Sequence, residues 1–567
     1  MNSAKNPIEA SDTLGASVLE VRGLSVAFPS RKGDVSAIED VSFDLRLGQT
    51  TCFVGESGSG KSVTARAVMN IVEPAIIKQG AINLVDLKAG QKLELSGMDP
   101  DGIDIRAVRG ARIAMIFQEP MSSLSPVHTI GDQIIEAILL HQAVDPAQAR
   151  EIAIEALSAV QIKGPEIAVD KYPFEYSGGM RQRAMIAMAL ACQPDILIAD
   201  EPTTALDVTT QAEILRLLRG LQDTRNMAIM FITHDMGVVA EIGDQVVVML
   251  HGKVVESGDV DTVFHAPKHR YTKRLLDSAL GLNRPPAENR EASTAETLIE
   301  TRDVCLGFPL SGRNKGAIKA LDNVSLDLKR GEILGVVGES GSGKTTLARV
   351  LMGQFQPQSG SATYLAQDGK SIDLSKAASF RDGKVYREMR MIFQDPYGSL
   401  NPRMTIEQII GEPLFVNGIL SGANLRNRVA ELLERVGLPS NMMERYPHAF
   451  SGGQRQRISI ARAIALEPRV IIADEATSAL DGSIRSQILD LLLGLRSELD
   501  LAILFIAHDI GVVRYFCDRV VVMHQGRVVE TGTAIQICDN PQEPYTRQLI
   551  SAVPIPDPRK RHLTTPT

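Results

Sequence analysis

One eight-residue run occurs twice in the chain, as GESGSGKS at residues 55–62 and as GESGSGKT at residues 338–345. Four further landmarks recur in the same order, 274 or 276 residues apart: Gln118 with Gln394, Ser177 with Ser451, Asp200 with Asp474, and His234 with His508. Solenoid repeats have periods of about 20–50 residues, so this repeat is of another kind. We expect two whole domains of one type, joined in tandem.

The composition between the repeats indicates where the domains end. Residues 281–297 are rich in Pro, Asn, Glu and Ala and have no apolar periodicity, which predicts an exposed linker. Residues 1–17 are similarly polar and are expected to be flexible. The predicted organisation is an N-terminus at 1–17, a first domain at 18–280, a linker at 281–297, a second domain at 298–555 and a tail at 556–567.

Charge, hydropathy and cysteine usage exclude several classes of protein. The formal net charge of −8 gives no support for broad nucleic-acid binding, and the basic residues 559–562 are expected to form a solvated end. The longest apolar run covers residues 184–192, well short of the roughly 20 residues that span a bilayer. The N-terminus lacks the apolar region of a secretory signal. Five scattered cysteines predict neither a disulfide framework nor a zinc site.

Each half contains three short apolar runs that end in glycine or in acidic residues. They are TTCFVG (50–55), DILIADEP (195–202) and MAIMFITHD (227–235) in the first half, and EILGVVG (332–338), RVIIADEA (469–476) and LAILFIAHD (501–509) in the second. Longer helical patterns alternate with these runs, which predicts an α/β fold with a mostly parallel, covered sheet. The chemistry of such sheets lies beyond the carboxyl ends of the strands, where these polar residues fall.

The repeated run fits the pattern G-x-x-x-x-G-K-[ST], which binds phosphate through backbone N–H groups at the start of a helix. Its lysine is expected to contact the β- and γ-phosphates, and its final hydroxyl to ligate Mg²⁺. The predicted residues are Gly55, Ser57, Gly58, Gly60, Lys61 and Ser62 in the first half, and Gly338, Ser340, Gly341, Gly343, Lys344 and Thr345 in the second.

Two acids follow the strand that ends at residue 200 or 474. Asp200 and Asp474 are expected to support Mg²⁺, whereas the next residue, Glu201 or Glu475, is placed to polarise an attacking water. A single histidine is more often a core or surface residue than a catalytic one. His234 and His508, however, occupy matching positions, each followed by Asp, which favours a role in holding that water.

A Ser-Gly-Gly turn precedes a helical pattern in each half, in YSGGMRQR (176–183) and FSGGQRQR (450–457). Such a turn offers a hydroxyl and free N–H groups at a helix N-terminus, which is a second anion site. The predicted residues are Ser177, Gly178 and Gly179 in the first half, and Ser451, Gly452 and Gly453 in the second. Because each half already holds a complete lysine loop, the second site is best explained if it serves the nucleotide of the other half.

Together these motifs resemble the ATP-binding-cassette superfamily over nearly the whole chain: Walker A, Q-loop, signature, Walker B with Glu, D-loop and switch His follow one another twice. The resemblance implies two cassettes, each with a RecA-like parallel-sheet core, an antiparallel β part and a helical subdomain. It also implies that two cassettes enclose two ATP molecules head to tail, with the Lys61 site facing Ser451 and the Lys344 site facing Ser177. Gln118 and Gln394 would then contact nucleotide and Mg²⁺, and Phe28 and Phe308 would stack on adenine.

A finer likeness concerns the peptide-import branch of this superfamily, which residues 117–134 and 393–410 resemble after each Q-loop, as do residues 266–279 and 540–554 at the end of each half. It implies an ATP-hydrolysing importer subunit for peptides or peptide-like compounds, with nickel and glutathione left open, driven by ATP-dependent closure of its halves. The implied partners are two transmembrane permease subunits and, indirectly, an extracytoplasmic binding protein. The implied location is the cytoplasmic face of the bacterial inner membrane.

Two departures from the pattern and two alternatives bear on this hypothesis. Met180 stands where the second half has Gln454, and the cysteine cluster of some relatives is missing, so no iron–sulfur site is expected. A soluble twin cassette acting on ribosomes or DNA would have a long charged linker or large insertions, whereas residues 281–297 are short and lack a charge run. A sugar-importer twin cassette usually lacks the full catalytic set in its second half, which Glu475 and His508 supply here.

Overall fold

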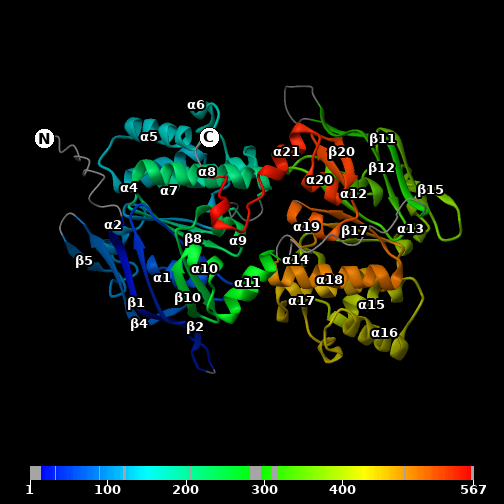
Figure 1. Cartoon of the computed structure of the whole chain (residues 1–567), viewed down its shortest axis with the longest axis horizontal. Helices are drawn as coiled ribbons and strands as arrows, with labels where there is room; N and C mark the ends of the chain where they lie inside the picture. The colour runs from blue at the N-terminus through cyan, green and yellow to red at the C-terminus, as the bar shows by residue number, and fades with distance from the viewer. Residues whose placement is uncertain are drawn as a thin grey trace. The chain divides into compact units, whose positions relative to one another are not determined.

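The computed structural model describes residues 15–31, 33–87, 90–118, 123–203, 206–280, 295–309, 317–477, 480–507 and 509–563. These residues form two compact units (Figure 1). The first takes the described residues of Met1–Leu206, Thr210–Ala279 and Pro554–Thr567, and the second those of Asp207–Thr209 and Leu280–Val553. Each unit combines two sheets with helices, so the predicted α/β class is confirmed.

The first unit contains a four-stranded antiparallel sheet, in the order β2-β1-β4-β5, and a six-stranded sheet, in the order β10-β9-β3-β8-β7-β6. In the larger sheet the strands from β9 to β6 are parallel and β10 is antiparallel at the edge. The strand bounds are β1 (Ser17–Phe28), β2 (Val35–Arg46), β3 (Thr50–Val54), β4 (Ile76–Asp86), β5 (Gln91–Glu94), β6 (Ile113–Ile116), β7 (Ile196–Asp200), β8 (Ala228–Thr233), β9 (Gln245–Leu250) and β10 (Lys253–Asp259).

Two groups of helices in the first unit have distinct surroundings. α4, α5 and α7 contact one another and form a helical subdomain, apart from the antiparallel sheet in Figure 1. α1, α9 and α10 pack close to the parallel sheet, and α11 ends the cassette. The bounds are α1 (Lys61–Val68), α2 (Ile103–Val108), α4 (Ile130–His141), α5 (Pro146–Ala159), α6 (Pro165–Ala168), α7 (Gly178–Leu190), α8 (Val208–Arg225), α9 (Met236–Ile242), α10 (Val260–His265) and α11 (Arg270–Leu280).

The second unit repeats this topology, with sheet orders β12-β11-β14-β15 and β16-β17-β18-β13-β19-β20. Its strands are β11 (Thr297–Pro309), β12 (Ala317–Lys329), β13 (Ile333–Val337), β14 (Ser359–Leu365), β15 (Ser371–Asp373), β16 (Met389–Ile392), β17 (Val470–Asp474), β18 (Ala502–Ile506), β19 (Arg519–His524) and β20 (Arg527–Thr533). Its helices are α12 (Lys344–Leu351), α13 (Lys384–Glu388), α14 (Pro396–Ser399), α15 (Ile406–Val416), α16 (Gly422–Arg435), α17 (Gly452–Ile464), α18 (Gly482–Leu499), α19 (Ile510–Phe516), α20 (Ala534–Asp539) and α21 (Pro544–Ser551).

The central strands are continuous apolar runs because both faces of the parallel sheet are covered. Every residue of β3, β7 and β8 is buried, as is every residue of β13, β17 and β18. These six strands coincide with the six runs expected from the sequence. In the second unit one face packs on the antiparallel sheet and α12, and the other on helices α15 to α19, giving two apolar cores. The carboxyl ends of the strands therefore meet at one edge, where the polar motifs lie.

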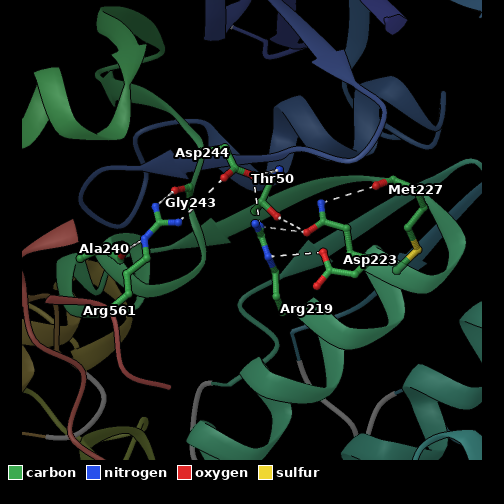
Figure 2. A network of polar contacts seen from close by, with 9 residues as sticks. Thr50, Arg219, Asp223, Met227, Ala240, Gly243, Asp244 and Arg561 are labelled. Atoms are coloured by element: carbon green, nitrogen blue, oxygen red, sulfur yellow. Dashed lines mark hydrogen bonds and ion pairs between the residues drawn. The ribbon is translucent and has the colours of Figure 1, made fainter. Parts of the chain in front are cut away.

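The end of the chain belongs to the first unit. Arg561 donates from Nε to the carbonyl of Ala240 at 2.9 Å and from a terminal nitrogen to the carbonyl of Gly243, beside Asp244 and its network (Figure 2). Arg559 donates to both carboxylate oxygens of Asp261 at 2.8 Å. The prediction of a solvated basic end at residues 559–562 therefore holds for Arg559 and Lys560, whose side chains are exposed, and is wrong for Arg561 and His562, which are half-buried against the first unit.

Within the described residues, no helix is both long and apolar enough to cross a membrane. In that same part of the chain, no three His, Cys, Asp or Glu side chains gather as a metal-binding group. The five cysteines are free thiols.

Candidate functional site

The phosphate loops follow β3 and β13 and fold alike in the two units. Gly55 leaves β3 with φ 154° so close to the next strand that a Cβ atom would lie 2.3 Å from the carbonyl oxygen of Met249. Gly60 has φ 100°, a left-handed conformation that glycine adopts readily, and is the N-cap of α1. Gly338 and Gly343 repeat both features before α12. Ser57, Gly58, Ser340 and Gly341 lie within the two loops, as predicted.

The loop lysines lie inside the curl of backbone that precedes them. Lys61 Nζ donates to the carbonyls of Gly55 and Glu56 at 2.7 and 3.0 Å. Lys344 Nζ donates to those of Gly338 and Glu339 at 2.8 and 2.7 Å. Both side chains are buried, and burial lowers the pKa of Lys344. A buried ammonium that donates to uncharged carbonyl oxygens would gain from an anion, so each loop is suited to phosphate.

A hydroxyl and a carboxylate meet beside each lysine. Ser62 Oγ donates to Asp200 Oδ1 at 3.0 Å, and Thr345 Oγ1 donates to Asp474 Oδ1 at 3.1 Å. Burial raises the pKa of Asp200 and of Asp474, because a carboxylate is poorly stabilised away from water. A nearby cation would offset that cost, and these oxygen ligands are the type that Mg²⁺ prefers. The residues present therefore fit the ion.

The glutamate after each aspartate has a strained backbone, and Glu201 contacts two of the predicted polar residues. Glu201 and Glu475 both have φ 47°, which is uncommon for a residue with a side chain and is frequent at functional sites. Gln118 Nε2 donates to Glu201 Oε2 at 2.9 Å, and His234 Nδ1 lies 3.3 Å from Glu201 Oε1. The structure thus brings these three predicted residues together from the ends of β6, β7 and β8.

The second unit repeats this arrangement as far as it is described. Gln394 Nε2 donates to Glu475 Oε2 at 2.6 Å, and the backbone N–H of Glu475 bonds to the carbonyl of Ile506 at 3.0 Å. His508 lies outside the described residues.

The Ser-Gly-Gly turns begin helices α7 and α17 in the helical subdomains. Ser177 accepts the N–H of Met180 at 3.3 Å, and Ser451 accepts the N–H of Gln454 at 3.4 Å. The Gln454 side chain also accepts the N–H of Ser451, which closes a capping box that methionine cannot make. Gly178, Gly179, Gly452 and Gly453 form the first turns of these helices. The facing of each turn toward the other unit's lysine stays a prediction.

The aromatic side chains expected at adenine lie near the ends of β1 and β11. Phe28 and Phe308 are 37% and 38% exposed, so each ring has a face available to a ligand. Phe308 also meets the edge of Phe355, with ring centroids 5.3 Å apart. Stacking on adenine stays a prediction.

Sequence reasoning missed one pair of residues at this site. The hydroxyls of Tyr271 and Tyr545 accept the N–H groups of Glu56 and Glu339, at 2.8 and 3.0 Å, near the start of the phosphate loops. Both tyrosines lie in the segments at the end of each half, where the pair Tyr-Thr recurs 274 residues apart. That recurrence was the available signal.

An anion-binding loop with its lysine, a hydroxyl–aspartate pair and a glutamate held by glutamine, at the carboxyl edge of a parallel sheet, define a P-loop nucleoside triphosphatase. The chain carries this site twice. The ABC transporter family matches residues 38–204 and 321–478, and the C-terminal region of oligopeptide/dipeptide transporters matches residues 255–305 and 529–567. The chain therefore belongs to the ABC transporter family, as an ATP-hydrolysing importer subunit with two fused cassettes.

Two curated relatives agree with this assignment, and a solved structure shows a partial likeness. The glutathione import ATP-binding proteins GsiA of Escherichia coli (strain K12) and of Shigella boydii serotype 4 (strain Sb227) are each 47% identical over 97% of this chain and 92% of the relative. The structure of cbiO1 from Clostridium perfringens, part of an ABC transporter complex, is 30% identical over 43% of this chain and 90% of its own, with a TM-score of 0.37. The ribosome- or DNA-acting alternative is not favoured by the match to the glutathione import proteins or by the oligopeptide/dipeptide transporter C-terminal region.

Proposed function

We propose that the protein binds two ATP molecules, one at each lysine loop, and hydrolyses both to power import of peptides or peptide-like compounds. The observation that carries this proposal is the duplication of the site. Three hydrogen bonds recur in both units: from Lys61 and Lys344 to a loop carbonyl, from the loop hydroxyls to Asp200 and Asp474, and from a glutamine to Glu201 and Glu475. Neither copy has lost a catalytic group, so we expect two working sites.

Mg²⁺ would be held by Ser62 and Asp200 in the first unit and by Thr345 and Asp474 in the second, with Gln118 and Gln394 as further oxygen ligands. The ion would supply positive charge beside the β- and γ-phosphates. Gln118 and Gln394 currently donate to the catalytic glutamates, so turning toward an ion would release those carboxylates. The glutamine thereby connects occupancy of the phosphate site with the state of Glu201 or Glu475.

The two glutamates are proposed as the groups that polarise the attacking water, and His234 and His508 as the groups that hold it. Glu201 has the hydrogen-bonding geometry for this role, because one carboxylate oxygen faces Gln118 and the other faces His234. A positioned carboxylate that takes a proton from water increases the rate about 10²–10⁴-fold. We expect ATP binding to depend on the lysine loops and to persist when either glutamate is replaced.

Closure of the two cassettes is proposed to follow from the γ-phosphate. Ser451, Gly452 and Gly453 would contact the nucleotide held by Lys61, and Ser177, Gly178 and Gly179 the one held by Lys344. The free N–H groups at the starts of α7 and α17 support this role, because helix N-termini stabilise anions. ADP lacks the phosphate that would join the halves, so hydrolysis would reopen them.

The transport role requires further subunits. We propose two transmembrane permeases as direct partners, an extracytoplasmic binding protein as an indirect one, and a peripheral position on the cytoplasmic face of the bacterial inner membrane. The name of the relatives and the matching oligopeptide C-terminal region favour glutathione or a short peptide as cargo. The domain limits given above, 18–280 and 298–555, are proposed as those of the two cassettes.

The double variant Glu201→Gln, Glu475→Gln tests this mechanism. It keeps both lysine loops, so we expect it to bind ATP and to accumulate a closed, ATP-filled form with phosphate release reduced at least a hundredfold. Small-angle scattering with ATP and with ADP reports closure, and a phosphate sensor reports turnover. Undiminished phosphate release would contradict the role of the glutamates. A form that stays equally open with both nucleotides would contradict closure.

A further inference from the structure

The helix that ends each cassette contacts the phosphate loop of the same unit. Tyr271 is the second residue of α11, and its hydroxyl accepts the backbone N–H of Glu56 at 2.8 Å. Tyr545 is the second residue of α21, and its hydroxyl accepts the N–H of Glu339 at 3.0 Å. The same contact is thus built twice, between segments more than 200 residues apart in sequence.

The loop residue held by each tyrosine also bonds to the phosphate-binding lysine. Lys61 Nζ donates to the carbonyl of Glu56 at 3.0 Å, and Lys344 Nζ donates to the carbonyl of Glu339 at 2.7 Å. One residue of the loop is therefore fixed at its N–H by the tyrosine and at its carbonyl by the lysine. A shift of that residue would move the ammonium group and the neighbouring loop N–H groups together.

The tyrosines are themselves held in place. Glu256 on β10 accepts the backbone N–H groups of Lys268 and His269, at 2.7 and 3.0 Å, just before α11. Glu530 on β20 accepts those of Gln542 and Glu543, at 2.8 and 3.1 Å, just before α21. A carboxylate thus anchors the approach to each helix, in both copies.

Packing also fixes the two rings, although by different neighbours. Tyr271 is 4% exposed, and Arg274 lies over its ring while bonding to the Glu56 carboxylate at 3.1 Å. The Tyr545 ring stacks on His524, with centroids 3.9 Å apart. Burial raises the pKa of Tyr545 to about 12, so its hydroxyl is neutral at physiological pH. The contact between Tyr545 and Glu339 is therefore an uncharged hydrogen bond at physiological pH.

We propose that Tyr271 and Tyr545 are positioning residues that hold the phosphate loops in their binding conformation and so set nucleotide affinity. Both lie in the part of the chain that matches the oligopeptide-transporter C-terminal region, residues 255–305 and 529–567. That region therefore acts on the phosphate site from within each cassette. The inference depends on nucleotide binding at the lysine loops and not on closure of the two halves.

The test removes one hydroxyl and leaves the ring. Tyr271→Phe is made in a full-length chain that carries Lys344→Ala, and Tyr545→Phe in one that carries Lys61→Ala. Only one phosphate loop then binds nucleotide in each chain. Competition with a fluorescent ATP analogue gives the dissociation constant of ADP. We expect ADP to bind about three- to tenfold more weakly, the range that loss of one neutral hydrogen bond produces. With both lysines present, either tyrosine variant should raise the KM for ATP and leave kcat within about twofold.

Tyr364→Phe is the matched control. It removes a buried hydroxyl that donates to Glu388 at 2.8 Å in the antiparallel sheet, away from the phosphate loop, and should leave ADP affinity unchanged. Unchanged ADP affinity in both tyrosine variants would overturn the proposal, as would a loss of thermal stability without a change in affinity. ADP lacks the γ-phosphate that closure requires, so a failure of the closure mechanism would leave this measurement intact.

Discussion

Helices α9 and α19 follow equivalent strands in the two units, yet their surroundings differ. Every residue of α9 is buried, including Gly237, Ala240 and Glu241. At the matching positions of α19, Gly511, Arg514 and Tyr515 are partly exposed. The units are thus alike at the carboxyl edge of the sheet, where nucleotide chemistry requires a fixed geometry, and have diverged on the helix that leads away from it.

The end of the chain accounts for the burial of α9. The carbonyls of Ala240 and Gly243, at the end of this helix, accept hydrogen bonds from Arg561, beside the Asp244 network (Figure 2). The buried carboxylate of Glu241 accepts the N–H groups of His562 and Leu563, at 3.2 and 3.1 Å. A guanidinium at a helix C-terminus is favourable because it meets the negative end of the helix dipole.

The second unit satisfies the same positions with its own side chains. Arg514, the counterpart of Ala240, forms two hydrogen bonds with Asp539, at 2.9 and 3.1 Å. Tyr515, the counterpart of Glu241, donates to Asp490. A small residue and a buried acid thus suit a helix covered by the chain terminus, whereas a long cation and an aromatic hydroxyl suit one that contacts water. The duplication keeps the backbone and adapts the side chains to what lies outside it.

The largest test of this comparison is catalytic. Because the hydroxyl–aspartate and glutamine–glutamate hydrogen bonds recur in the two sites, Glu201→Gln and Glu475→Gln should lower ATP hydrolysis to the same extent. Each substitution should lower the rate at its own site about 10²–10⁴-fold. Phosphate release by the two single variants, measured side by side, checks this expectation. Glu39→Gln changes an exposed glutamate and should leave the rate unchanged. A variant with parental activity would show that its site is silent and the units are functionally unequal.

Removal of the tail should separate the stabilities of the two units. A chain that ends at Val553 loses the burial of Leu563, which is 1% exposed, and leaves Glu241 without its two backbone donors. Full burial of a leucine contributes about 1.5–3 kcal/mol. With about 2–4 °C per kcal/mol for domains of this size, we expect the first unit to unfold roughly 3–12 °C lower.

Calorimetry and hydrogen exchange together assign that loss. The shortened chain should show faster exchange of amides in α9 and unchanged exchange in α19, because the tail contacts are on α9. A calorimetric transition of the second unit at its parental temperature serves as the internal control. Parental exchange in α9 would contradict the stabilising role of the tail.

A glycine and a cysteine exchange places between the units, which permits a smaller test. Cys52 and Gly243 in the first unit correspond to Gly335 and Cys517 in the second, so each pair fills the same space from opposite sides. A Cβ atom on Gly243 would lie 2.9 Å from Cys52 Sγ, and one on Gly335 would lie 2.9 Å from Cys517 Sγ. Each Gly→Ala substitution should therefore cost about 1–3 kcal/mol through overpacking.

The two clashes differ in what else they meet, and this makes the expectation specific. The Gly243 Cβ would also lie 2.7 Å from the carbonyl oxygen of Val239, which is backbone and cannot turn away. Cys517→Ala should therefore rescue Gly335→Ala, whereas Cys52→Ala should not rescue Gly243→Ala. Thermal unfolding of the two glycine variants and of the two glycine–cysteine double variants measures both outcomes. Equal rescue in the two units would show that the carbonyl relaxes and the asymmetry has no energetic effect.

The sequence predicted three central strands of each parallel sheet and the catalytic edge at which they end. Strands such as β7 and β17 are short runs buried on both faces, so the apolar pattern and the acid at the end mark their bounds to within one or two residues. The loop lysines and the aspartates are also tied to fixed spacing, because phosphate and metal geometry permit few alternatives.

Contacts between distant segments could not be predicted in the same way. A tyrosine near the start of a trailing helix has no local pattern that points to the phosphate loop, and Arg561 lies in a basic, proline-containing end that is typical of solvated termini. The contact of Glu241 with the end of the chain could not be predicted either, because one acidic residue in an apolar helix does not indicate which residue it contacts. In each case the partner is set by how the chain folds back, which a single sequence records only through the 274-residue recurrence, as with Tyr271 and Tyr545.

The smallest effect concerns the pH dependence of the tail contact. Two hydrogen bonds from Arg559 hold the pKa of Asp261 below its usual value. The stability contributed by this pair is therefore present above the ordinary aspartate pKa and is lost as the pH falls through the lowered pKa of the folded state. Arg559→Ala should slightly lower the unfolding temperature of the first unit near neutral pH, and the difference from the parent should shrink in acid. The pair is exposed, so the change is small.

Arg426→Ala, which breaks an exposed pair with Glu444 in the second unit, should leave the first transition unchanged at every pH. A difference that grows as the solution is acidified would contradict the assigned direction, because it would require the carboxylate to be less stable in the folded chain than in the unfolded one.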